Sequence, residues 1–81
     1  MTARRAHRFP LFCRVRVRAV PERGRPIIET RRMQVGDVGV VVMLLEAEGM
    51  PLAYSVECNS SNGEPRWLAD IPEDCLEAVE E

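Results

Sequence analysis

Residues 38–45 read Val-Gly-Val-Val-Val-Met-Leu-Leu, and this stretch decides the fold. Successive side chains of a β-strand point to opposite faces of the sheet, and here both alternate sets are apolar apart from Gly39. The pattern predicts a central strand that is either covered on both sides or presents one apolar face to a partner. Eight residues are far fewer than the roughly 20 that span a bilayer, so we expect no membrane association.

The neighbouring segments also alternate. In residues 11–20, the apolar positions fall on one face and the arginines on the other, which predicts a half-buried strand. Residues 27–33 are interpreted as a short strand or as one limb of a loop. In the predicted strand of residues 11–20, the apolar face consists of Cys13, Val15, Val17 and Ala19. The opposite face consists of Arg14, Arg16 and Arg18.

Turn-forming residues separate the later strands. Residues 52–58 and 64–71 flank a segment ending in Asn62-Gly63, which predicts a hairpin. The residues from Ile71 to Asp74 resemble one tight helical turn, because Pro72 and the acids suit an early helical position. Residues 75–79 are then expected to form a last short strand.

Five strands with short connections predict an all-β fold, a five-stranded small barrel with one short helical turn before the last strand. The chain of 81 residues has room for one domain. We expect a flexible basic arm over residues 1–10, the barrel over residues 11–79 and an acidic terminus over residues 80–81.

Charge is distributed unevenly along the chain. Residues 1–32 contain ten arginines and two acids, whereas residues 33–81 contain one arginine and eleven acids. The basic part could bind nucleic acid or a membrane surface, or it could be neutralised by the acidic part after folding, which is the interpretation we favour.

The sequence has no lysine and one histidine, His7, near its start. This composition excludes a Schiff-base lysine and a histidine-dependent catalytic triad in the core, and we expect a non-enzymatic protein with no catalytic residue, metal or cofactor. Cys13, Cys58 and Cys75 are widely spaced with no Cys-x-x-Cys pair, and they are interpreted as free thiols of a cytoplasmic protein.

The order of these features resembles an SH3-like barrel. Residues 36–41, Gly-Asp-Val-Gly-Val-Val, and residues 71–77, Ile-Pro-Glu-Asp-Cys-Leu-Glu, are similar to the bacterial family named domain of unknown function 4926. More loosely, Phe12 with the Val-Arg-Val-Arg run of residues 15–18, and Tyr54-Ser55-Val56, resemble the SH3-like part of the nitrile hydratase β subunit. The resemblance implies an SH3-like fold over residues 11–79. It implies no hydratase activity, because the cysteine cluster that holds the metal in that enzyme is lacking here.

Two groups of residues are candidate binding residues. Arg14, Arg16 and Arg18 would form a row spaced about 6.5–7 Å apart, suited either to phosphates or to cross-strand ion pairs with Glu57, Glu77 and Glu80. Arg66 and Trp67 follow the hairpin turn, where an exposed Trp67 would anchor a partner and a buried one would fill the interior.

Asp37, Asp70, Glu73 and Asp74 are the carboxylates that a catalytic interpretation would use. They occupy expected turn and cap positions, where acids are common, so we interpret them as structural.

Three functions follow from these features. The first is a binding module for a protein partner, with the loop of residues 21–35 and the hairpin of residues 59–67 as adjacent surfaces. The alternatives are a nucleic-acid-associated protein of the KOW type, using Arg4, Arg5, Arg8 and the arginine row, and an accessory subunit of a larger enzyme related to the nitrile hydratase β subunit.

Overall fold

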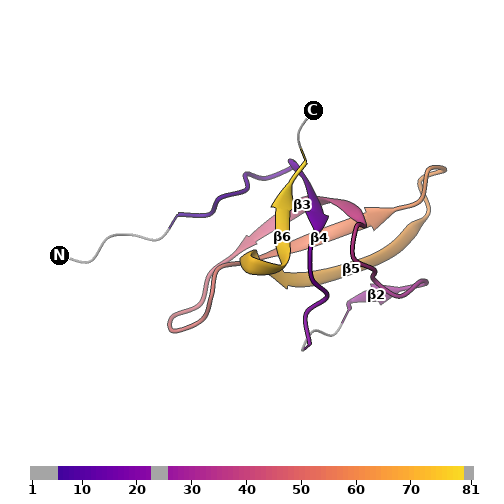
Figure 1. Ribbon diagram of the computed structural model, residues 1–81. Coiled ribbons are helices and arrows are strands. Elements are labelled where there is room, and N and C mark those ends of the chain that lie inside the picture. Colours follow the sequence, from indigo (N-terminus) through magenta and orange to yellow (C-terminus); the bar gives the residue numbers. More distant parts are fainter. Residues whose placement is uncertain (1–5, 23–25, 80–81) are drawn as a thin grey trace.

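The computed structural model describes residues 6–22 and 26–79, and their strands form a single antiparallel sheet (Figure 1). The sheet order is β2-β5-β4-β3-β1-β6, and β3 is central, as predicted. The all-β class is therefore confirmed. The elements are β1 (Arg14–Val17), β2 (Ile28–Glu29), β3 (Val38–Leu45), β4 (Ala53–Asn59), β5 (Pro65–Pro72), a 3-10 turn (Glu73–Cys75) and β6 (Leu76–Ala78).

The sheet differs from the predicted five-stranded barrel in two respects. Ile28 pairs with Leu68 and Glu29 pairs with Trp67, so β2 adds a sixth strand to those described. This strand and β6 are the two ends of the sheet order, so the strand pairing is open and a closed barrel is not confirmed.

The first strand is shorter than the alternating pattern of residues 11–20. Phe12 before it has a left-handed backbone with φ of 69°, which interrupts the extended chain. After it, the N–H groups of Arg18 and Ala19 both donate to the carbonyl oxygen of Cys75, at 2.8 and 3.4 Å, as the chain leaves the sheet. Ala19, expected on the buried face, is consequently exposed.

The two predicted turns are confirmed. β4 and β5 form a hairpin in which the N–H of Ser60 donates to the Glu64 carbonyl oxygen at 2.8 Å. Gly63 has φ of 86°, while Asn62 stays at negative φ, so the loop is not the two-residue type that needs positive φ at both positions. The 3-10 turn follows Pro72 and leads directly into β6.

The core lies on one side of the sheet, called here the inner face. Cross-strand pairs such as Val41 with Val56 and Tyr54 with Ile71 place their side chains together on this face. Removing this apolar surface from water is the main stabilising contribution to such a fold. The buried cluster consists of Phe9, Val15, Val17, Val41, Tyr54, Val56, Cys58, Trp67, Ala69, Ile71 and Leu76.

The segment before β1 packs against the sheet, whereas the sequence predicted a flexible arm over residues 1–10. Phe9 is buried in the core, and the His7 ring makes an edge-on contact with Tyr54 at 5.0 Å between centroids. The N–H of Phe9 donates to the Tyr54 hydroxyl oxygen at 3.2 Å, and that hydroxyl donates to the Glu73 carboxylate. Residues 1–5 of the predicted arm lie outside the described residues.

Replacing Tyr54 by phenylalanine is expected to lower the free energy of unfolding by about 1–2 kcal/mol, because the buried N–H of Phe9 then loses its acceptor. Burial and the bond to Glu73 raise the pKa of Tyr54 to about 12, so the hydroxyl is protonated and able to donate at neutral pH. Urea unfolding measures the loss, and amide exchange of Phe9 locates it. Glu73→Gln, which keeps an acceptor oxygen, should cost less; an equal or larger loss in that variant would contradict the assignment.

Candidate functional site: the outer face of the sheet

Two of the predicted arginines lie on the face of the sheet opposite the core, called here the outer face. Arg14 pairs with Val40 and Arg16 pairs with Val38, so these side chains share a face with the apolar residues of β3. Arg18 lies beyond the end of β1. The predicted row of three is therefore reduced to two positions on the strand.

Arg16 forms an ion pair with Glu77 of β6, with 3.9 Å between Nη1 and Oε1. Both side chains are well exposed, so such a pair contributes at most about 1 kcal/mol. Glu77 is one of the three acids expected opposite the arginines. Of the other two, Glu57 lies on β4 and Glu80 is outside the described residues.

Trp67 presents no side-chain surface to a partner, because its exposed fraction is 0%. Its indole N–H donates to the Asp37 carboxylate at 2.9 Å, so the polar atom of the buried ring is satisfied. The structure therefore agrees with the alternative in which Trp67 fills the interior. Arg66 is half-buried, and its carbonyl oxygen accepts from the N–H of Thr30 at 2.8 Å.

The predicted binding residues do not form one site. β1, which carries Arg14 and Arg16, is separated in the sheet order from β5, which carries Arg66 and Trp67, by both β3 and β4.

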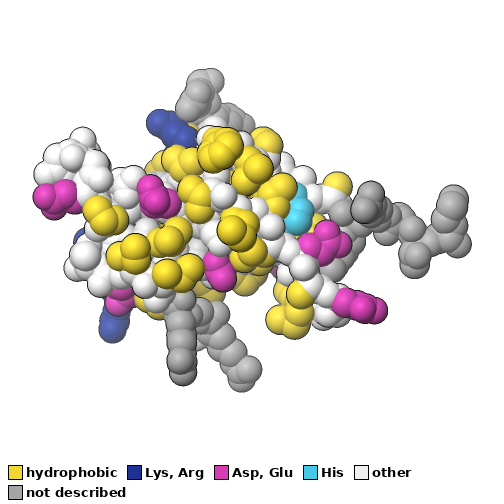
Figure 2. Space-filling model, turned by 180° about the vertical axis from the view of Figure 1, so that it is seen from behind, with side chains coloured by type: hydrophobic (Ala, Val, Ile, Leu, Met, Phe, Trp, Pro, Cys, Tyr) yellow, Lys and Arg dark blue, Asp and Glu magenta, His cyan; other side chains and the backbone are white. Residues whose placement is uncertain are grey.

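What the structure does bring together is an apolar surface on the outer face. Met43 is 54% exposed, Ile28 is 43% exposed and Val38 is 37% exposed. The pairing register places half-buried residues between them, since Val40, Leu45, Ala53 and Leu68 share the same face. Figure 2 shows hydrophobic side chains gathered across one side of the molecule, with acidic groups among them.

The sequence explains how this surface arises. β3 is apolar at both alternate sets of positions, but only Gly39 and Val41 of this strand are fully buried. A register shift between Val41 and Met43 then brings Met43 opposite Ser55 on the outer face. Of the two alternatives for this strand, residues 6–22 and 26–79 do not supply cover on both sides, and they leave one apolar face exposed.

Charged groups of opposite sign flank the apolar residues of β3. Arg14 and Arg16 stand on the β1 side of β3, whereas Glu57 and Asp70 stand on the β4–β5 side. Both acids have hydrogen-bond donors. Ser55 Oγ donates to Asp70 at 2.6 Å, and Asn59 Nδ2 donates to Glu57 at 2.9 Å.

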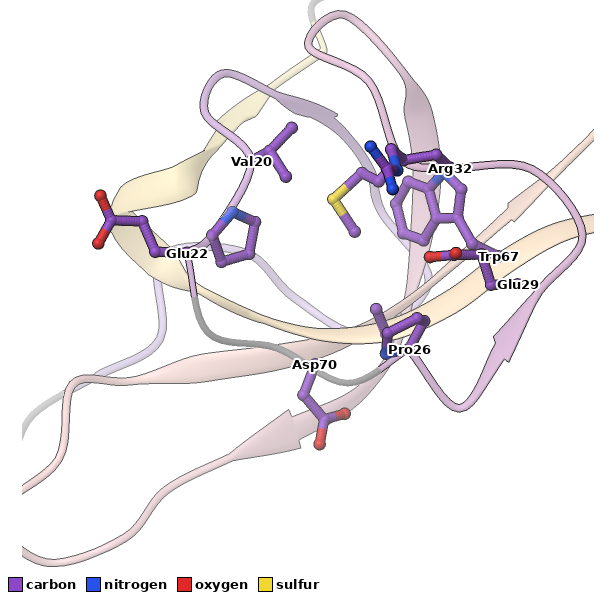
Figure 3. Close-up of a pocket in the computed structure, with 10 residues that line it drawn as sticks. Val20, Glu22, Pro26, Glu29, Arg32, Trp67 and Asp70 are labelled. Carbon is purple, nitrogen blue, oxygen red and sulfur yellow. The ribbon is translucent and has the colours of Figure 1, made fainter.

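A separate pocket of about 470 Å³ lies on the inner side, below the connection between β1 and β3 (Figure 3). Val20, Pro26 and Trp67 surround the space, whereas the carboxylates of Glu22 and Asp70 point away from it. Two of the four charged residues that line the pocket, Glu22 and Asp70, therefore do not contribute to a polar ligand site within it. This pocket includes part of the loop predicted as an interaction surface.

Asp37 has a structural role that the sequence did not reveal. Its carboxylate accepts hydrogen bonds from Arg31 Nη2, Trp67 Nε1 and the N–H of Gln34, each at 2.9 Å. Burial raises the pKa of Asp37, but these hydrogen bonds outweigh it and hold the pKa below its usual value. Trp67 is 30 residues away in sequence, so no local signal could have identified this contact.

The remaining candidate groups do not form a reactive centre in the described residues. Burial raises the pKa of the Cys13, Cys58 and Cys75 thiols, which keeps them protonated and weakly nucleophilic. Within residues 6–22 and 26–79, no group of three or more His, Cys, Asp or Glu side chains is placed to hold a metal ion.

Comparison with known proteins adds no assignment: no protein-family model, curated protein or solved structure matches the chain. No helix in the described part of the chain has the length and apolar character needed to cross a membrane.

Proposed function

We propose that this chain is a non-enzymatic binding module that docks a protein on the outer face of its sheet. The observation that carries the proposal is the exposed apolar surface of β3, represented by Val38 and Met43. Glu57 on β4 separates this surface from Leu68 and Ile28. The solvated face of an antiparallel sheet is ordinarily polar. A contiguous apolar surface with a charged rim is the usual composition of a protein-binding site.

The charges on the same face favour a protein over a nucleic acid. Glu57, Asp70 and Glu77 share the outer face with Arg14 and Arg16. Glu77 beside Arg16, and the acids across β3, oppose the approach of a phosphate backbone, which binds best to an uncompensated basic surface. A protein surface that is apolar at its centre and carries both signs of charge at its rim is complementary to this face.

The SH3-like class and a reducing, cytoplasmic environment belong to the same proposal. The SH3-like class is supported by the order of elements, with a long irregular connection after β1, the β4–β5 hairpin and a 3-10 turn before the last strand. The environment is supported by the three free thiols.

Photo-crosslinking from the outer face tests the proposal. A benzophenone amino acid introduced at Met43 is expected to give covalent protein adducts after irradiation in cells, because the exposed side chain lies within the docking surface. The same probe at the exposed Asp74, in the 3-10 turn, is the control and should give none. Adducts of equal yield at both positions, or none at Met43, would overturn the proposal.

A further inference from the structure

We infer that the protein docked on the outer face is a second copy of this chain, held by a two-fold axis that runs parallel to β3. This inference rests on the proposed function, because it names the partner of the same surface. It follows from the order of charges and apolar residues across the sheet.

The pairing register arranges one row of side chains across four strands of the outer face. Arg14 pairs with Val40, Val40 pairs with Glu57, and Glu57 pairs with Leu68. Neighbouring strands lie about 4.8 Å apart, so a cation and an anion flank Val40 at similar distances on opposite sides. The first three members of the row are therefore basic, apolar and acidic, with Val40 at their centre.

Two sheets can stack face to face about a two-fold axis in either of two ways, and the charges distinguish them. An axis parallel to the strands and above Val40 exchanges the two sides of the sheet, so Arg14 of each copy faces Glu57 of the other. An axis across the strands keeps each side over itself, so Arg14 would face Arg14. Because like charges brought together at an interface are costly, the first arrangement is favoured.

The same axis matches the apolar residues of β3 with one another. It places β3 of one copy over β3 of the other, so that Val38, Val40, Met43 and Leu45 pack on their own counterparts. Such an interface is isologous and self-complementary, as two-fold dimers require. Stacked sheets lie about 10 Å apart with nearly aligned strands, which is the geometry of a β-sandwich.

Charge exchange between two variants tests the inference. In Arg14→Glu, a glutamate of each copy would face Glu57, and in Glu57→Arg an arginine would face Arg14. Each variant alone is expected to dimerise about tenfold or more weakly than the parent in analytical ultracentrifugation. An equimolar mixture should restore a dimer containing one copy of each, because both contacts then join opposite charges.

The mixture also separates contacts between copies from effects within one copy. Arg14 has interactions within its own chain, and losing these cannot be repaired by adding the other variant. Glu48→Arg changes the net charge as much as Glu57→Arg does, but lies in the connection between β3 and β4 and should leave dimerisation unchanged. Melting curves confirm that each variant is folded.

A parent protein that stays monomeric at all concentrations would overturn the inference, as would a dimer insensitive to both reversals or a mixture that fails to associate. The Met43 probe distinguishes this failure from that of the proposed function. Adducts of twice the chain mass support the second copy. Adducts only with another protein would support the docking surface but exclude the second copy as its occupant. Absence of adducts would contradict both the proposed function and this inference.

Discussion

Replacing Gly39 by alanine is expected to lower the free energy of unfolding by about 3 kcal/mol. A Cβ atom at this position would lie 2.7 Å from both the carbonyl oxygen of Glu57 and Cγ1 of Val56. The first of these belongs to the backbone of the neighbouring strand, so the clash is relieved only if β3 and β4 move apart. Thermal and urea unfolding measure the loss.

Gly49→Ala provides the matched control. Gly49 has φ of 75°, but no atom lies within 4 Å of its added Cβ. Its substitution therefore introduces only backbone strain, worth about 1 kcal/mol. If Gly39→Ala costs no more than Gly49→Ala, the close approach of β3 and β4 at Gly39 is contradicted.

Replacing Asp37 by alanine is expected to cost about 3 kcal/mol, because the buried indole N–H of Trp67 loses its acceptor and Arg31 loses its ion-pair partner. Chemical unfolding followed by Trp67 fluorescence measures this loss at its site. Asp37→Asn keeps one acceptor oxygen and should be intermediate in stability. If Asp37→Ala is as stable as the parent, the hydrogen bonds of Asp37 contribute nothing to the free energy of unfolding.

Asp37 should also make stability depend on pH. Because its pKa is lower in the folded chain than the usual 3.8, its stabilising effect is complete above that value and is lost as pH falls through the lowered pKa. The parent is therefore expected to lose more stability than Asp37→Asn between neutral pH and strong acid. Glu73, whose pKa is also lowered by its hydrogen bonds despite burial, retains an acid dependence in both proteins. Identical pH profiles of melting temperature would contradict this expectation.

The candidate surface was only half predictable from the sequence. The doubly apolar pattern of residues 38–45 identified the strand and its two alternatives, because alternation depends only on neighbouring residues. Whether a second layer covers the outer face depends on how many strands and helices the rest of the chain supplies. In the described residues all the strands join one sheet with one packed side, so the outer face of β3 is left to solvent.

The binding role of Trp67 was open for a similar reason. An aromatic residue after a hairpin turn is compatible with an exposed or a buried position, and the nearby sequence cannot distinguish them. Its pairing with Cys58 points it to the inner face, where Asp37 completes its hydrogen bonding. Trp67, a candidate binding residue, is therefore part of the core. The candidate site consists instead of residues whose exposure no local sequence pattern specifies.

The sequence by itself determined the all-β class, the hairpin at Asn62-Gly63 and the helical turn before β6, since each depends on local backbone preferences and on side-chain alternation. Only the tertiary structure decided the sixth strand, the burial of Phe9 under Tyr54 and the row that joins Arg14, Val40 and Glu57. These features require the pairing of segments far apart in the chain. That pairing is selected by the free energy of the whole packed sheet rather than by any single segment.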